Sequence, residues 1–269
     1  MLKDITIGQY FPGDSVVHKL DARFKILITA VFIVMLFSAK NFISLGVALL
    51  FFVMAFAASK LSPKLMLKSL KPIIPVIVIT SVLNIFFIEG ITLVKIYTLR
   101  ITDKGLETSA FMIIRLIALI CGSSLLTYTT SPIVLTDAIE QILKPLAKIK
   151  FPAHELAMMM TIALRFIPTL IEETDKIMAA QKARGAELDS GSLTQRAKAL
   201  VPILIPLFVS SFRRAEELAL AMECRCYNGG EGRTRLRQLR SAPRDYIALG
   251  VTLVFLAAAI AVSIITKTR

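Results

Sequence analysis

Between Phe24 and Ser59 the sequence reads FKILITAVFIVMLFSAKNFISLGVALLFFVMAFAAS, two apolar runs with only Lys40 and Asn41 between them. A membrane-spanning helix needs about 20 predominantly apolar residues and tolerates about 17, because it must cross the hydrocarbon core. The second run meets this length. The first run is shorter, so we expect Arg23 and Lys25 to extend it by snorkelling towards water.

Three further apolar runs follow, at Pro72–Ile88, Ser109–Thr127 and Tyr246–Thr266. Hydrophobic residues make up 55% of the 269-residue chain. Soluble domains rarely exceed about half, and the apolar residues here come in long blocks, as in membrane proteins. We therefore predict an all-α polytopic membrane protein with about five transmembrane helices and long cytoplasmic helices before the last span.

The placement of Lys and Arg predicts the orientation, because cytoplasmic segments of membrane proteins carry an excess of these residues. With the N-terminus inside, the inner segments carry the basic residues of Lys3–Lys25, Lys60–Lys71 and Lys144–Arg244. The outer segments carry Lys40, the basic residues of Lys95–Lys104, and two more near the C-terminus. This bias explains the net charge of +13, so we expect no nucleic-acid partner.

Four regions follow from this topology. We expect a cytoplasmic N-terminal segment at 1–23, a four-helix transmembrane region at 24–129, a cytoplasmic coupling-helix region at 130–244 and a last transmembrane helix at 245–269. The third region itself contains helical patterns, at Pro132–Lys148, His154–Ala186 and Leu200–Cys226. At 1.5 Å per residue, helices of about 30 residues reach about 45 Å, from the membrane to a cytoplasmic partner.

Charged residues inside apolar segments leave two questions open. Leu156–Ile171 is apolar enough to form a sixth span, although Arg165 and Pro168 within it argue against this alternative. Arg115 is the one charge well inside a predicted span. Snorkelling or a structural bond to another helix is the favoured interpretation for Arg115, and a role in a substrate path is the alternative.

No arrangement of catalytic residues is recognisable. The two histidines, His18 and His154, neighbour no set of metal ligands, and there is no nucleotide-binding P-loop. The predicted spans contain no acidic residue, which argues against a proton relay. The three cysteines form no disulfide framework: Cys121 lies in an apolar run, and the predicted cytoplasmic Cys224 and Cys226 are expected to be reduced thiols. We therefore predict a non-enzymatic protein with no metal site and no cofactor.

Arg184 and Arg225 are predicted to close the two long helices. Gly185 suits the left-handed position that follows a helix. A basic residue in a last helical turn is worth about 0.3–1 kcal/mol against the helix dipole, which explains either arginine alone. Two such ends favour bidentate contacts with acidic grooves on another protein, and small neighbours such as Ala183 and Cys226 would let the helix end enter a groove.

The sequence resembles the transmembrane subunit of energy-coupling factor transporters, the EcfT family, in two places. GQYFPGDS at Gly8–Ser15, followed by HKLDARFK at His18–Lys25, is similar to the family's opening segment. Ala183-Arg184-Gly185 matches the first Ala-Arg-Gly signature of the family. Cys224-Arg225-Cys226 takes the place of the second signature and keeps its arginine alone.

The resemblance implies a coupling subunit of a bacterial importer for a vitamin or a metal ion, located in the cell membrane. Two ABC ATPase subunits would hydrolyse ATP and bind the ends of the long helices. A small substrate-binding membrane subunit, the S component, would recognise the cargo and dock on their apolar halves, where Met suits a surface that repacks. The implied ATPase contacts are Arg184, Arg225, Ala183, Gly185, Cys224 and Cys226. The implied docking residues are Met158, Met159, Met160, Leu204 and Leu207.

Two other functions were weighed. A membrane-embedded lipid-processing enzyme would need a catalytic base or a metal set at the bilayer boundary, and the sequence offers none. A transporter with its own substrate path is disfavoured because the chain has no intramembrane acids and no inverted repeat. The coupling subunit is therefore the leading hypothesis.

Overall fold

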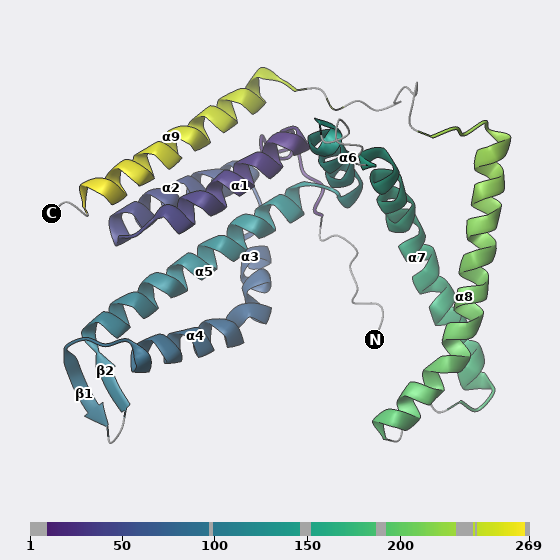
Figure 1. The fold of residues 1–269 in the computed structure, drawn as a ribbon, viewed down its shortest axis with the longest axis horizontal. Coiled ribbons are helices and arrows are strands. Elements are labelled where there is room, and N and C mark those ends of the chain that lie inside the picture. The colour runs from purple at the N-terminus through teal and green to yellow at the C-terminus, as the bar shows by residue number, and fades with distance from the viewer. Residues whose placement is uncertain are drawn as a thin grey trace. The chain divides into compact units, whose positions relative to one another are not determined.

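The computed structural model describes residues 10–96, 99–145, 152–186, 192–229, 239 and 241–266. The elements in chain order are α1 (Ala22–Ser38), α2 (Phe42–Ser59), α3 (Pro63–Leu70), the 3₁₀ helix η2 (Lys71–Ile73), α4 (Ile74–Phe87), β1 (Thr92–Ile96), β2 (Leu99–Thr102), α5 (Asp103–Thr129), α6 (Pro132–Leu143), α7 (Ala153–Ala183), α8 (Leu193–Cys224) and α9 (Pro243–Ile265) (Figure 1). The predicted helical fold is confirmed, with one addition. The antiparallel hairpin β1–β2 joins α4 to α5.

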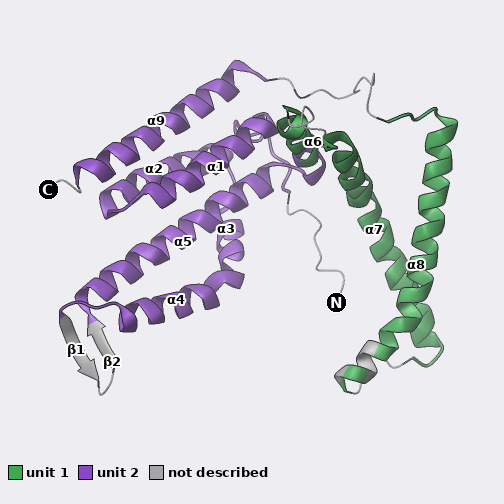
Figure 2. Ribbon diagram, in the orientation of Figure 1, with its two compact units in different colours: residues 1–7, 136–238 green, residues 8–135, 239–269 purple. Residues whose placement is uncertain are grey.

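The chain divides into two compact units (Figure 2). The first, which we call the bundle unit, comprises residues 8–135 and 239–269 and contains α1 to α5 and α9. The second, which we call the crossed-helix unit, comprises residues 136–238 together with 1–7 and contains α7 and α8.

Among the described residues, five helical segments are long and apolar enough to cross a membrane. They are Phe42–Ser59, Pro63–Phe87, Asp103–Thr129, Ala153–Ala183 and Pro243–Ile265. The number agrees with the prediction, but the membership differs. Helix α1 has 17 residues, at the lower limit of about 17 for a span. Helix α7 qualifies by length and composition, so the alternative with a further span stays open on those grounds.

Several helix boundaries differ from those expected, for local reasons. Helix α5 begins at Asp103 rather than Ser109, because the Thr102 hydroxyl accepts the Gly105 N–H at 3.1 Å and caps the helix. The third apolar run begins with the turn η2, which contains Pro72, and prolines are favoured in a first helical turn. Helix α8 begins at Leu193, seven residues before the expected start.

The core of the bundle unit lies where α1, α2, α5 and α9 pack together. Phe32 and Phe51 are buried there with centroids 5.9 Å apart, and the Phe51 ring lies 5.5 Å from that of Phe255 on α9. Gly122 of α5 lies so close to α1 that an added Cβ would be 2.3 Å from the Phe32 ring. Small residues allow this close approach, which matters because packing holds helices together within lipid.

Arg115 makes a structural bond between helices, as the favoured interpretation expected. Its guanidinium donates to the backbone carbonyl of Ala39, the residue that caps the C-terminus of α1. Its charge also lies over the ring of Phe111, 4.5 Å from the centroid, and 5.9 Å from that of Phe37. The positive charge thus meets the negative end of the α1 dipole and two aromatic faces.

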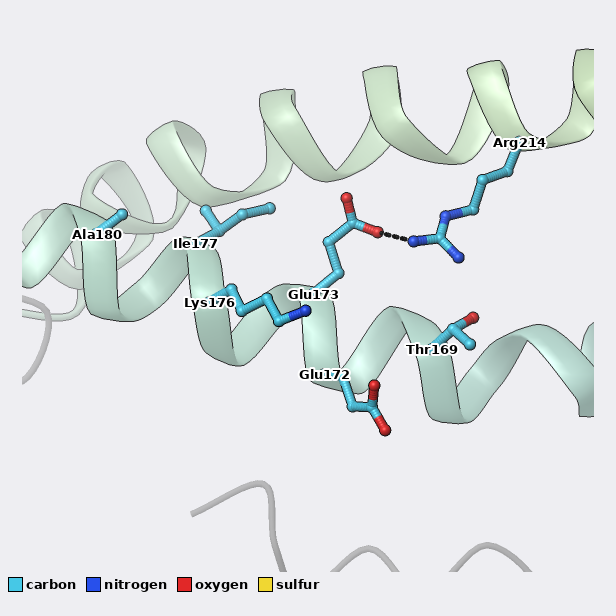
Figure 3. Close-up of a pocket in the computed structure, with 7 residues that line it drawn as sticks. All are labelled: Thr169, Glu172, Glu173, Lys176, Ile177, Ala180 and Arg214. Carbon is cyan, nitrogen blue, oxygen red and sulfur yellow. Dashed lines mark hydrogen bonds and ion pairs between the residues drawn. The ribbon is translucent and has the colours of Figure 1, made fainter.

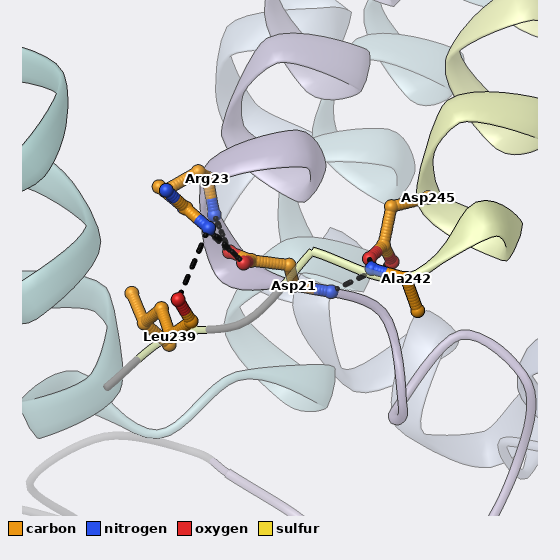
Figure 4. Close-up of polar contacts among 5 residues, drawn as sticks. All are labelled: Asp21, Arg23, Leu239, Ala242 and Asp245. Atoms are coloured by element: carbon orange, nitrogen blue, oxygen red, sulfur yellow. Dashed lines mark hydrogen bonds and ion pairs between the residues drawn. The ribbon is translucent and has the colours of Figure 1, made fainter. Parts of the chain in front are cut away.

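A polar cluster ties the start of α1 to the start of α9 (Figure 4). The buried carboxylate of Asp245 accepts the N–H of Ala242 at 2.6 Å and that of Asp21 at 3.0 Å. Asp21 in turn caps α1 and pairs with Arg23 at 2.6 Å, and Arg23 also donates to the carbonyl of Leu239 at 3.3 Å. Burial alone would raise the pKa of Asp21, but the hydrogen bonds and charge of Arg23 outweigh it and lower the pKa.

In the crossed-helix unit, α7 and α8 run antiparallel and cross (Figure 1). Gln181 near the end of α7 donates to the carbonyl of Pro202 early in α8, at 3.2 Å. Glu173 contacts Ser210 and Arg214, farther along α8. The C-terminal ends of the two helices lie on opposite sides of the crossing.

Candidate functional site

Helix α7 ends in a tightly hydrogen-bonded cap around Arg184. Gly185 has a φ of +87°, the left-handed conformation expected for it, and donates its N–H to the carbonyl of Lys182 at 3.0 Å. The N–H of Ala186 reaches the carbonyl of Gln181 at 3.0 Å. These two bonds define a Schellman cap and leave the Arg184 side chain at the very end of the helix.

Helix α8 ends in the same cap around Arg225. Cys226 donates its N–H to the carbonyl of Glu223 at 2.8 Å, and Tyr227 donates to that of Met222 at 3.0 Å. The left-handed position is held here by Cys226, with a φ of +56°. Residues other than glycine rarely adopt this left-handed conformation. The two arginines therefore occupy equivalent backbone positions although their neighbours differ.

The two ends, which we call the arginine tips, are open to solvent. The tips comprise residues 183–185 and 224–226, all of which are exposed. Within the described part of the chain, neither Arg184 nor Arg225 forms an ion pair. Two guanidinium groups are thus presented at rigid helix ends, with small side chains on either side, a geometry suited to bidentate contacts with carboxylates.

The predicted docking residues lie in the N-terminal half of α7 and the middle of α8. Met159 and Leu204 are 54% and 45% exposed, and Met160 is also exposed. Met158 and Leu207 are half-buried.

Much of the apolar surface of α8 was not predicted from the sequence. Between residues 200 and 212, its additional exposed large hydrophobic residues are Leu200, Val201, Ile205, Phe208, Val209 and Phe212. We call these residues, with Leu204, the α8 apolar surface. Because this segment is apolar all round, no single stripe could be picked from its periodicity; a run of exposed apolar residues is itself the signal of an interaction surface.

A link between α7 and α8 was also missed. The Glu173 carboxylate pairs with the Arg214 guanidinium at 2.8 Å (Figure 3). It also accepts a hydrogen bond from the Ser210 hydroxyl. We call these three residues the crossing link. Two of them, Glu173 and Arg214, border a surface pocket of about 370 Å³. Glu173 and Arg214 are 41 positions apart in the sequence, so local sequence patterns do not predict this contact.

The structure brings together no group of metal-ligating side chains in the residues that it describes. Within those ranges, no three His, Cys, Asp or Glu side chains come together as a metal site. His154 instead contacts the Glu140 carboxylate at 3.1 Å. Cys121 is buried, whereas Cys224 and Cys226 are exposed free thiols. The exposed guanidinium groups of the arginine tips can donate paired hydrogen bonds to a carboxylate.

The chain is similar to known proteins over most of its length. Residues 13–236 match the CbiQ family, described as cobalt transport protein. An energy-coupling factor transporter transmembrane protein EcfT from Clostridium kluyveri is 58% identical over 92% of this chain and 93% of its own length. Proteins of the same name from Thermosediminibacter oceani and Bacillus subtilis are 55% and 46% identical, over 93% and 96% of this chain and 95% and 97% of their own lengths.

These matches extend through both units and both arginine tips. The five apolar helices agree with a multi-pass membrane protein. The relatives are named as transmembrane proteins of a transporter. The chain therefore belongs to the CbiQ family, described as cobalt transport protein, and to the energy-coupling factor transporter transmembrane proteins named EcfT.

Proposed function

We propose that this chain couples two ABC ATPase subunits to a separate small membrane protein, the S component, that binds a vitamin or a metal ion. The chain itself has no catalytic role: the ATPase subunits hydrolyse ATP, and the crossed-helix unit transmits their motion. The observation that carries the proposal is the pair of equivalent arginine tips, both exposed and on opposite sides of one helix crossing.

The matching caps support two similar binding partners. Arg184 and Arg225 hold the same position in the same type of cap, so two like acidic grooves would receive like side chains. A Schellman cap fixes the last turn, which limits the backbone entropy lost when a tip is bound. Two copies or two homologous ATPase subunits fit this duplication better than one partner does.

The α8 apolar surface and Met158–Met160 support the docking of a membrane subunit. Phe212 and Phe208 are 70% and 61% exposed. Large contiguous apolar patches are rare on soluble proteins and mark interaction sites. An S component is itself apolar, so its surface would cover these side chains. The half-buried Leu207 and Met158 would then support the edges of the contact.

An N-terminus inside the cell, with α7 and α8 on the cytoplasmic side, completes the proposal. The excess of Lys and Arg in 144–244 supports it through the positive-inside rule. Arg165 is exposed in the apolar half of α7, and a lipid-facing arginine at mid-helix would be costly in a span. This favours α7 lying at the membrane surface instead of crossing the bilayer.

The test is a pull-down of the tagged chain co-expressed with its ATPase subunits and an S component, from mild detergent. Charge reversal at both tips, Arg184→Glu with Arg225→Glu, opposes carboxylates to acidic grooves and should cost several kcal/mol. We expect the ATPase subunits to be lost while the S component and the helical content are retained. The single variants should each show a partial loss.

Arg213→Glu is the matched control, because this arginine is exposed on α8 but lies 12 residues before the tip. It should retain the ATPase subunits at the wild-type level. Recovery of the intact complex with the double tip variant would contradict the proposed function, as would equal loss in the control.

A further inference from the structure

The crossing link joins α7 and α8 at matching places along both helices. Glu173 lies 11 residues before Arg184, and Arg214 lies 11 residues before Arg225. Eleven residues make about three turns of an α-helix, so each link residue is on the same face as the arginine of its own tip. At 1.5 Å per residue, the ion pair lies about 16 Å from either tip.

The link brings together charges that no local pattern pairs. Glu173 accepts from both Ser210 and Arg214 of the other helix, and its side chain is 22% exposed in the ion pair. Figure 3 shows the carboxylate of Glu173 and the guanidinium of Arg214 directed towards each other across the two helices. A carboxylate with both a hydroxyl and a guanidinium as donors is held in direction as well as in place.

The surroundings of the link leave room for a change in the crossing angle between α7 and α8. The adjoining pocket of about 370 Å³ is bordered by Thr169, Lys176 and Ala180 of α7, as well as by Glu173 and Arg214 of the link. Tight packing would resist rotation of one helix against the other, since packed interiors have few voids. Here a polar contact beside open space holds two helices that continue for three turns beyond it.

We propose that Glu173 and Arg214, supported by Ser210, are positioning residues that form the pivot of the crossed helices. Because both tips lie equally far from the pivot, displacement of one tip is accompanied by an equal displacement of the other. The inference rests on the proposed function, in which each tip is held by an ATPase subunit. It predicts that weakening the link separates ATPase binding from the transmission of motion.

The test uses the complete complex, with spin labels at Ala179 and Leu220 after replacement of the three native cysteines. Both positions are exposed and lie between the pivot and a tip. The distance between labels is measured by pulsed electron resonance with and without the ATP analogue AMP-PNP and Mg²⁺. In the wild-type complex, the analogue should shift the distance.

Glu173→Gln should retain the ATPase subunits. With the analogue, it should change the ratio of the shifted to the unshifted label distance by roughly threefold, a free-energy change typical of part-exposed ion pairs. The exchange Glu173→Arg with Arg214→Glu restores opposite charges and should restore the wild-type shift. Glu172→Gln, at the neighbouring exposed glutamate, is the matched control and should leave the shift unchanged.

Three outcomes would overturn the pivot: a wild-type response in Glu173→Gln, no rescue by the charge exchange, or no nucleotide-dependent shift in a wild-type complex that contains both ATPase subunits. Failure of the proposed function gives a different result, because the wild-type chain would then recover no ATPase subunits at all. The two ideas are thus tested separately in one preparation.

Discussion

The bundle unit and the crossed-helix unit are both rich in apolar side chains, but they place these side chains differently. In the bundle unit, Phe32 is buried against Gly122 and the polar groups at helix ends are paired internally, as Asp245 shows. In the crossed-helix unit, residues such as Phe208 and Leu204 remain exposed, and Arg184 and Arg225 extend from rigid ends.

This difference indicates which kind of surface, lipid or protein, covers the exposed side chains of each unit. Lipid can cover the outside of the bundle, because hydrocarbon chains accept any apolar surface. Exposed arginines at capped ends and a patch of aromatic side chains need defined protein surfaces instead. Substitutions in the bundle should therefore change stability, whereas substitutions in the crossed-helix unit should change binding.

The largest effect is expected from placing charges on the docking surface. Met159→Asp with Leu204→Asp would bury two unpaired carboxylates beneath the S component, at a cost of about 3 kcal/mol or more. Retention of the S component in a pull-down should fall at least about 100-fold, the equivalent of that cost. Met159→Leu with Leu204→Met is the volume-conserving control, and equal retention in all three chains would contradict the docking surface.

The next effect concerns the polar cluster of the bundle. Asp245→Ala leaves the N–H groups of Asp21 and Ala242 without their acceptor, which should cost about 2–4 kcal/mol of unfolding free energy. Thermal unfolding in detergent, followed by circular dichroism, measures the loss. Asp245→Asn keeps one acceptor oxygen and should lose less. An unchanged midpoint for the alanine variant would show that this cluster does not stabilise the bundle.

Close packing in the bundle predicts a smaller loss. Gly122→Ala places a methyl group 2.3 Å from the Phe32 ring, and such overpacking typically costs about 1–3 kcal/mol. Gly46→Ala is the matched control on α2, since nothing lies within 4 Å of its added carbon. The control should keep or slightly raise the unfolding midpoint. Equal behaviour of the two variants would argue against the close approach of α1 and α5.

The smallest effect distinguishes the two arginine tips. Cys226→Gly relieves a left-handed residue at the end of α8 and should stabilise that end by about 1 kcal/mol. Gly185→Ala should destabilise the end of α7 by a similar amount. Hydrogen exchange at residues 184–186 and 225–227 follows both ends separately. Faster exchange in Cys226→Gly would contradict the equivalence of the caps.

Local features of the fold could be predicted from the sequence. The long apolar runs indicated the helices, and Gly185 predicted the cap of α7, because glycine is the usual residue at that position. The matching cap at Cys226 could not be predicted, since no local preference favours cysteine in a left-handed conformation. It follows from the same hydrogen bonds at the end of α8.

Contacts between segments that are distant in the sequence could not be predicted from it. The bond from Arg115 to Ala39 joins residues 76 apart, and the ion pair of Glu173 with Arg214 joins residues 41 apart. Each depends on how whole helices pack, which periodicity does not encode. For the same reason, the exposed part of α8 was not separated from its buried part, because apolar residues surround that helix on every side.

The most direct test of the account asks on which side of the membrane the arginine tips lie. Cys224 and Cys226 are exposed beside Arg225, whereas Cys121 is buried, so a membrane-impermeant maleimide reports on the tip of α8. For a chain expressed without its partners, we predict labelling in inverted membrane vesicles and none in intact cells. A Lys40→Cys variant, with Cys121, Cys224 and Cys226 replaced, should be labelled in intact cells as the control. Labelling of Cys224 or Cys226 from outside intact cells would invert the topology and contradict a cytoplasmic coupling unit.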